Sequence, residues 1–344
     1  VGRAGGCCGL PPLAAARIPP TQRSAAALQW LLAERRAEGR SGDAGGSQLR
    51  CFDDGVIERL DPETGAAVSL TECRCTLSRR LRALAGITED EYFASVCASP
   101  WVVGGRGGEP PAASTRAASW RSSDGRLVVE IVGRQEIDTL RHMMPHLVLY
   151  FEQNARSLLC RYLGAYTLCR GGSQVHFVVM SSVLTEPAQQ VFGLKGTSED
   201  GWLEPATTVL AKDLRCRSEK VFVAPGDRQR LVEMARDDAE FLGAMHVADY
   251  SMLVGLRPAS CSSASSSGGE VRCWVPSCED RREACDMQLG IVDYLRCRTP
   301  KQAVAQWFSR FSIGCCFREV DVEPSAVYCR RFCKNIVEKL VSFR

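Results

Sequence analysis

The stretch RLVVEIVGRQEIDTLRHMMPHL, residues 126–147, decides the fold class because it combines a strand pattern and a helix pattern. Residues 126–132 form a short apolar run typical of a strand, and Gly133 supplies a turn. The spacing in 134–147 predicts an amphipathic helix with one apolar face, formed by Ile137, Leu140, Met143, Met144 and Leu147. Glu130 interrupts the strand near its end, where a charge either faces solvent or has a function.

Composition limits the classes of protein that the chain can belong to. With 344 residues and 45% hydrophobic content, it can bury one large core or two modest ones. A net charge of +3 is too small to indicate a nucleic-acid partner, so we expect none. No run of about 18 apolar residues occurs, and the first twenty residues lack the apolar centre of a signal peptide. We therefore expect no membrane span.

The 18 cysteines are scattered rather than regularly spaced, and four histidines accompany them. Cys273, Cys278 and Cys285 form only a weak zinc pattern. In a chain without a signal peptide, most of these thiols are expected to be reduced and buried. A zinc or redox protein therefore stays a minor alternative.

The order of patterns predicts an α+β protein behind a leader. Residues 1 to about 50 are rich in Ala, Gly, Arg and Pro, and residues 1–70 are predicted to be a disordered, low-complexity leader, with the helical pattern SAAALQWLLAERRAEG (24–39) as a local exception. The patterned domain covers 71–344, and its second half is predicted to be mainly helical with two short strands. Its expected elements after residue 147 are a strand at 174–184, a helix at 227–247, a strand at 251–257, a flexible insertion at 258–270, a strand at 289–295 and a helix at 325–343.

Asp249 and Asp293 stand out because each lies beside one of the two short strands. Either residue alone could be an ordinary cap of a helix or strand. As a pair they suit phosphoryl transfer, in which one acid lies near a hydroxyl nucleophile and another holds a divalent metal.

Six blocks resemble, in the same order, motifs of the phosphatidylinositol phosphate kinases. Together they cover roughly residues 77–344. The blocks are TLRHMMPHL (139–147) with NARSLLCRYLGAY (154–166), VHFVVMSSV (175–183), FGLKGT (192–197), VADYSMLVGL (247–256), GIVDYL (290–295) and VEPSAVYCRRFCKNIV (322–337). Six collinear blocks are not expected by chance.

The resemblance implies the two-lobed, protein-kinase-related fold of that family, with ATP bound between an N-lobe of about 77–185 and a C-lobe of about 186–344. By position, Asp249 corresponds to the catalytic aspartate beside the lipid hydroxyl, and Asp293 to the aspartate that binds Mg²⁺. The segment 178–182, with Val179 and Met180, corresponds to the hinge that contacts adenine. Glu136 corresponds to the helix glutamate that pairs with an ATP-binding lysine.

That lysine is missing, because Glu130 occupies its position six residues before Glu136. Two carboxylates about 4 Å apart repel each other by about 4 kcal/mol at an effective dielectric of 20, and both repel triphosphate. Two further differences point the same way. The phosphate-covering segment (115–126) lacks the family's glycine, and Gly193 replaces the aspartate of the family's Asp-Leu-Lys-Gly-Ser motif.

Lys195 is the best candidate to replace the missing lysine, although a solvated loop lysine is an equally good interpretation. In the segment corresponding to the family's headgroup loop, Arg296, Arg298 and Lys301 are candidates for lipid binding. Residues 296–344 contain 10 Lys and Arg against 4 Asp and Glu, which favours the anionic cytoplasmic face of a membrane. A solvated basic surface is the alternative.

Two functions compete. The first is a phosphatidylinositol phosphate kinase-like transferase that uses ATP and Mg²⁺ to phosphorylate a hydroxyl of an inositol lipid, in the cytoplasm and peripherally attached to the membrane. The second is a catalytically impaired pseudokinase that binds phosphoinositide membranes or a partner protein. Glu130 and Gly193 favour the second, whereas Asp249 and Asp293 favour the first.

Overall fold

The computed structural model of the 344-residue chain describes a mixed α/β protein built on two sheets. It describes residues 20–39, 54–62, 64–98, 101–103, 119–186, 188, 190–195, 211–213, 221–259, 270–276, 282–296 and 325–342. Within these residues, no helix is both long and apolar enough to cross a membrane.

The first sheet has seven antiparallel strands in the order β1-β2-β6-β7-β5-β4-β3. The elements of this half of the chain are α1 (Pro20–Gly39), β1 (Gly55–Leu60), β2 (Ala67–Glu72), α2 (Cys75–Leu84), α3 (Glu89–Cys97), β3 (Val102–Val103), β4 (Ser119–Arg121), β5 (Leu127–Val132), α4 (Arg134–Gln153), β6 (Tyr162–Arg170) and β7 (Ser173–Ser181).

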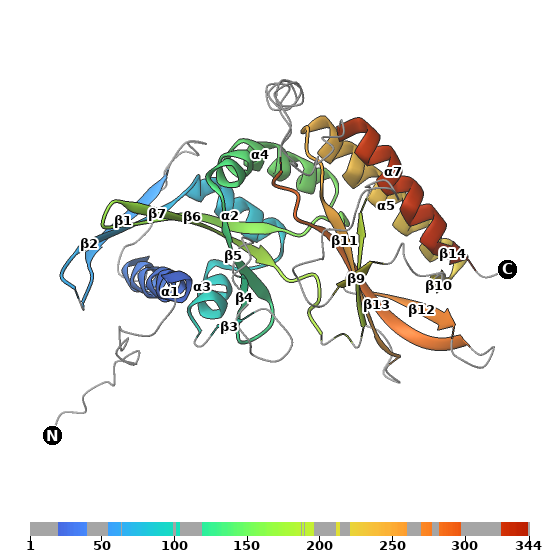
Figure 1. Ribbon diagram of the computed structural model, residues 1–344, viewed down its shortest axis with the longest axis horizontal. Coiled ribbons are helices and arrows are strands. Elements are labelled where there is room, and N and C mark those ends of the chain that lie inside the picture. Colours follow the sequence, from blue (N-terminus) through green and yellow to red (C-terminus); the bar gives the residue numbers. More distant parts are fainter. Residues whose placement is uncertain are drawn as a thin grey trace, which may run out of the picture.

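Helices cover both faces of this sheet, with α2 and α4 on one face and α1 and α3 on the other (Figure 1). The side chains of β7 show why, because Phe177 and Val179 pack in the α1/α3 core while Val178 and Met180 pack in the α4 core. A strand buried on both faces needs a continuous apolar run. This explains why VHFVVM lacks the polar alternation of a half-exposed strand.

The predicted strand and helix at 126–147 are confirmed, and α4 continues beyond the predicted end. Val148 and Phe151 extend its apolar stripe into the core. The helix ends at Asn154, whose backbone N–H and side-chain amide both donate to the carbonyl of Tyr150 at 2.8 and 3.0 Å.

The structure differs from the prediction of a disordered leader at residues 1–70. Helix α1 packs against α3, with Leu28, Leu31 and Leu32 completely buried, and β1 and β2 extend the first sheet. The helical pattern at 24–39, the expected exception within the leader, lies inside α1 and is confirmed. Arg35 of α1 also forms an ion pair with buried Glu72 of β2 at 2.5 Å.

The second sheet also has seven strands, in the order β14-β10-β12-β13-β11-β8-β9. Neighbours pair antiparallel except β10 with β14 and β8 with β9. Its half of the chain comprises β8 (Gln190–Lys195), β9 (Ala211–Asp213), β10 (Val221–Val223), α5 (Pro225–Ala244), β11 (Ser251–Pro258), β12 (Glu270–Pro276), β13 (Arg282–Val292), α7 (Ser325–Lys339) and β14 (Leu340–Ser342).

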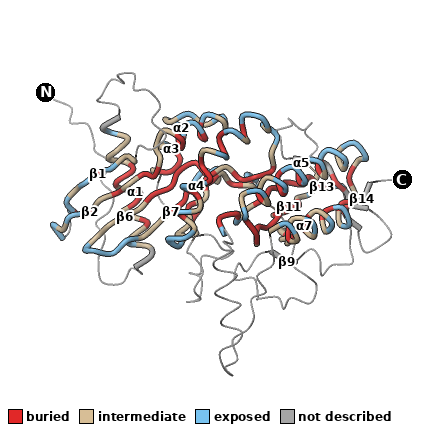
Figure 2. Tube along the Cα trace, turned by 90° about the horizontal axis from the view of Figure 1, so that it is seen from above, coloured by how far each residue is buried: buried red, intermediate tan, exposed pale blue. Residues whose placement is uncertain are grey.

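The prediction of a mainly helical second half with two short strands is therefore wrong. Strand β13 begins well before the apolar residues that predict it, because Asp286 and Gln288 interrupt its pattern although both are buried. Both have polar partners inside the protein, since Gln288 donates to the Thr185 hydroxyl at 2.9 Å and the carboxylate of Asp286 forms a long ion pair with Nε of Arg257 at 3.9 Å. The inner faces of α5 and α7 are buried and their outer faces exposed (Figure 2).

One hydrophobic core connects the two halves, and backbone hydrogen bonds fix their contact. Ile291 of β13 donates to the carbonyl of Leu158 at 2.7 Å and accepts from the N–H of Cys160 at 2.9 Å. Tyr294 donates to the carbonyl of Cys160. Gly290 allows this approach, because a Cβ there would lie within 3.1 Å of both Val183 and the Leu158 carbonyl.

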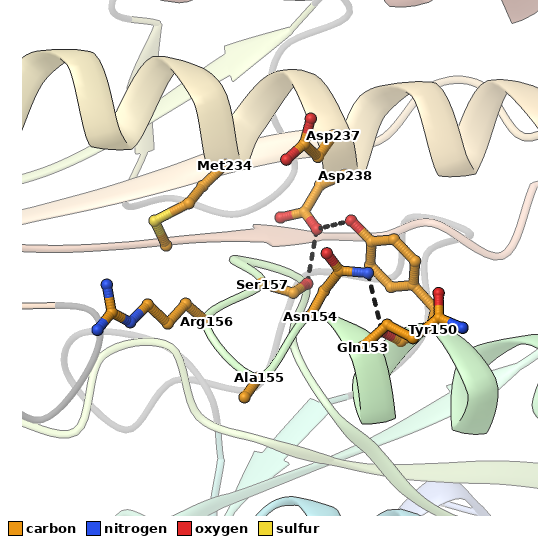
Figure 3. A pocket seen from close by; sticks show the side chains of 9 residues that line it. All are labelled: Tyr150, Gln153, Asn154, Ala155, Arg156, Ser157, Met234, Asp237 and Asp238. Carbon is orange, nitrogen blue, oxygen red and sulfur yellow. Dashed lines mark hydrogen bonds between the residues drawn. The ribbon is translucent and has the colours of Figure 1, made fainter.

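Asp238 of α5 holds the segment that leads from α4 into β6 (Figure 3). Its completely buried carboxylate accepts hydrogen bonds from the hydroxyls of Tyr150 and Ser157 and from the N–H of Leu158, at 2.6–2.7 Å. Burial raises the pKa of this carboxyl, and the three donors oppose that rise. Replacing the side chain would leave three donors without an acceptor.

We expect Asp238→Ala to lower the free energy of unfolding by about 3–5 kcal/mol, because removing one partner of a buried charged network leaves the others unsatisfied. The matched control is Asp237→Ala, which truncates the exposed neighbour on the same helix. This substitution should change the free energy of unfolding by less than about 0.5 kcal/mol. Chemical denaturation of the full chain measures both. Equal effects would show that Asp238 does not fix this junction.

Candidate active site

The register of the second sheet brings Asp249 and Asp293 to one edge. Strands β11 and β13 pair antiparallel with Ser251 opposite Val292. Asp249 precedes that row by two residues and Asp293 follows it by one, so both leave the sheet at the same end. Two acids 44 residues apart in sequence are therefore neighbours in space.

Both aspartates have left-handed backbones, with φ of 68° at Asp249 and 62° at Asp293. This conformation is unfavourable for residues with a side chain, although Asp tolerates it better than most, and it occurs often at functional sites. At each position the following tyrosine is completely buried. The carbonyl of Tyr250 accepts a hydrogen bond from the Tyr328 hydroxyl of α7. The hydroxyl of Tyr294 donates a hydrogen bond to the carbonyl of Cys160.

Glu136 joins this edge from the first half of the chain. Its Oε2 accepts the N–H of Gly133 at 2.8 Å and so caps α4, which fixes the orientation of the carboxylate. Its Oε1 lies 3.8 Å from Nε of Arg296, whose Nη1 lies 3.5 Å from Oδ2 of Asp249. Arg296 thus connects both halves at the candidate site, and its predicted contact with a lipid stays a prediction.

Glu130 points toward the same site and not to open solvent. It lies on the face of β5 that it shares with Val128 and Val132, which pack against the α4 core. Burial, Asp293 and Glu136 together raise its pKa to about 8. At neutral pH most Glu130 side chains are therefore protonated and uncharged, and the repulsion expected from two ionised glutamates is largely removed.

Lys195 ends β8 directly opposite Ser251, at the same edge as the aspartates. Its carbonyl accepts a hydrogen bond from the Asn335 side chain of α7 at 2.7 Å, which anchors its backbone. No ion pair joins its ammonium to another residue in the described part of the chain. Its role as a replacement for the missing lysine stays a prediction.

Val179 and Met180 lie inside β7, with side chains 0% and 4% exposed. Val179 and Met180 pair with residues of β5 on one side and of β6 on the other, within the sheet. The chain leaves the sheet after Ser181, and the N–H of Ser182 donates to the carbonyl of Arg126 at 2.8 Å. Contact of this segment with adenine stays a prediction, and Arg298 and Lys301 lie outside the described residues.

The donor set suits a metal that is bound together with a ligand. No group of three or more His, Cys, Asp or Glu side chains that could hold a metal ion occurs among the described residues. Mg²⁺ is commonly held by one or two carboxylates together with substrate phosphates. Asp249 and Asp293 can provide these carboxylates. The carboxylates at this edge therefore fit Mg²⁺ that arrives with a nucleotide.

Sequence reasoning missed the tyrosines that support the two aspartates, although a signal was present. The dipeptide Asp-Tyr occurs twice, at 249–250 and 293–294, each time beside a strand. The contact between Arg296 and Glu136 carried no comparable signal, because it joins residues 160 positions apart.

Comparison with known proteins points to one family. Residues 111–273 match the family model of the phosphatidylinositol-4-phosphate 5-kinases. A Dictyostelium discoideum protein named as a probable phosphatidylinositol phosphate kinase is 26% identical over 193 residues, which cover 52% of this chain and 26% of that protein. Phosphatidylinositol 4-phosphate 5-kinase-like protein 1 of Mus musculus is 28% identical over 191 residues, covering 52% and 46%.

The type-1 beta phosphatidylinositol 4-phosphate 5-kinase of Mus musculus is 26% identical over 187 residues, covering 52% of this chain and 34% of the kinase. The matched region thus spans about a quarter to a half of these relatives. The residues that match the family model, 111–273, contain the strand of Glu130, helix α4 and the Asp249 loop. The family match over residues 111–273 and the similarity to these relatives support assignment of the chain to the phosphatidylinositol phosphate kinase family, as a divergent member.

Proposed function

We propose that the chain is a lipid kinase that transfers the γ-phosphoryl group of ATP to a hydroxyl of an inositol lipid. The first and second sheets, each with its helices, would be the N-lobe and C-lobe of a protein-kinase-related fold. The observation that carries this proposal is the β11–β13 register, which places Asp249 and Asp293 at one edge, facing Glu136 and Glu130 of the first half.

Each residue has a defined task in this proposal. Asp249 would accept the proton of the lipid hydroxyl, or orient that hydroxyl for attack. Asp293 would hold Mg²⁺, which supplies Lewis-acid stabilisation of charge on the phosphates when MgATP is bound. Glu136, already oriented by capping α4, would direct a cation toward those phosphates.

The charge balance of the site is compatible with binding a nucleotide. Besides Glu130, whose raised pKa favours its neutral form, the site contains the carboxyl groups of Glu136, Asp249 and Asp293 and the Arg296 guanidinium. With the family's lysine at position 130, the site would hold the same three carboxyl groups, the Arg296 guanidinium and, in addition, one ammonium. The substitution at 130 therefore removes one cation without adding a full negative charge at neutral pH, which leaves nucleotide binding feasible.

The lipid substrate places the proposed reaction at a membrane surface. The matched relatives are named as kinases of phosphatidylinositol phosphates, so we propose a phosphoinositide headgroup as the substrate of this chain. Arg298, Lys301 and the excess of basic residues after 296 support peripheral attachment to the anionic cytoplasmic face.

The first test is thermal unfolding of the full chain with and without millimolar MgATP. Ligand at 100 times its Kd should add about 2.7 kcal/mol to the stability. Asp293→Asn should abolish most of the shift, since Asn keeps the left-handed backbone but removes the charge. The exposed Asp138→Asn on α4 is the matched control and should keep the shift. No shift for the unmodified chain would contradict the kinase proposal and favour the pseudokinase.

The charge state of Glu130 predicts a pH dependence of stability. Its pKa rises from the ordinary 4.5 to about 8 in the folded protein, so the folded state binds the proton more tightly. This contribution to stability is fully present below pH 4.5 and is lost as the pH rises to about 8. Relative to Glu130→Gln, which stays neutral, the unmodified chain should become progressively less stable between pH 5.5 and 8.5.

Unfolding midpoints measured across this pH range check the prediction. Glu58→Gln, at an exposed position of β1, is the control and should stay parallel to the unmodified chain. A constant difference between the unmodified chain and Glu130→Gln would show that Glu130 is ionised throughout and that the charge balance above is wrong.

A further inference from the structure

Among the described residues of the candidate site, Arg296 is the cation that forms ion pairs, and it lies beside the glutamate that corresponds to the partner of the missing lysine. Its guanidinium lies between Glu136 and Asp249, at 3.8 and 3.5 Å. In the family pattern, the helix glutamate orients a lysine that comes from the strand of Glu130. Here the same glutamate faces an arginine that comes from the opposite half of the chain.

The backbone of Arg296 is held in place although its side chain reaches solvent. Tyr294 and Leu295 are 0% and 4% exposed, and the carbonyl of Arg296 accepts the N–H of Ala248 at 3.2 Å. The Arg296 side chain is 43% exposed. Residue 296 is thus anchored beside the Asp249 loop while its guanidinium remains accessible to a ligand.

The two ion pairs are too loose to be the main purpose of this arginine. At 3.5 and 3.8 Å they exceed ordinary hydrogen-bond lengths, and partly exposed pairs of this kind add little to stability. A guanidinium has five N–H donors, and these two pairs involve only Nε and Nη1. Its planar donor arrangement matches phosphate oxygens well, and the triphosphate of ATP as a whole carries more negative charge than either carboxylate.

We propose that Arg296 is the phosphate-binding residue of this kinase and replaces, from the second half of the chain, the cation lost at position 130. The proposal rests on the proposed function and specifies which side chain binds the nucleotide phosphates. Glu136 would act as its positioning residue, because capping of α4 points Oε1 toward the guanidinium. Lys195 is the competing candidate, since it lies at the same edge without a described ion pair.

The test compares nucleotide affinity of full-length variants by calorimetry, with MgATP and with adenosine. Arg296→Ala should weaken MgATP about 10- to 100-fold, the effect of losing a charge-assisted contact, and leave adenosine binding unchanged. Arg296→Lys should lose less. Arg134→Ala, which removes an exposed arginine with an ion pair on α4, is the matched control and should not change MgATP affinity.

A rescue variant separates a phosphate contact from a structural role. In Glu130→Lys/Arg296→Ala the cation returns to the family's position, and MgATP affinity should recover most of the loss. Unfolding midpoints without ligand should stay close for all variants. Recovery with unchanged midpoints supports Arg296 as the substitute cation, because a merely structural defect would not be repaired by lysine at 130.

The other outcomes overturn the inference in distinguishable ways. If the unmodified chain binds MgATP and Arg296→Ala binds it equally well, the inference fails while the proposed function stands, and Lys195→Ala identifies the alternative. If Arg296→Ala weakens adenosine as much as MgATP, its effect is structural and the inference fails. If the unmodified chain binds no MgATP, both the proposed function and the inference fail.

Discussion

The hydrogen bonds between Ile291 and the segment from Leu158 to Cys160 are the constraint on which the rest of the structure depends. They connect a strand of the second sheet to the chain that enters the first, and Gly290 makes the approach possible. Asp238 holds the same segment from α5. Because Asp293 follows Ile291 by two residues and α4 ends just before Leu158, this junction sets how the carboxylates of the two halves face one another.

Packing of two buried tyrosines compensates for the unfavourable backbone conformations of Asp249 and Asp293. Asp249 and Asp293 both have positive φ, which is unfavourable for a residue with a side chain, and each is followed by a completely buried tyrosine. Tyr250 packs against Tyr328 and Phe332 of α7, and Tyr294 packs against Tyr162 of β6. Aromatic packing therefore holds the backbone in conformations that place the two carboxylates at the sheet edge.

Glu130 and Arg296 together set the charge of the candidate site. Glu130 is largely neutral at pH 7 because burial and two neighbouring carboxylates raise its pKa, so its repulsion of phosphates is smaller than its sequence position indicates. Arg296 brings a positive charge to Glu136 from the other side. Under the proposed role of Arg296, its guanidinium replaces the positive charge that the family pattern has at position 130.

The sequence by itself determined the family, the identity of the candidate acids and the strand and helix at 126–147, because these depend on local pattern and ordered motifs. It indicated α1 only in part, at 24–39, and did not reveal most of the second sheet, since Asp286 and Gln288 are polar residues buried through distant partners. The charge of Glu130 and the partner of Arg296 were decided only by tertiary structure. Both depend on distances between halves of the chain, and neither composition nor spacing contains those distances.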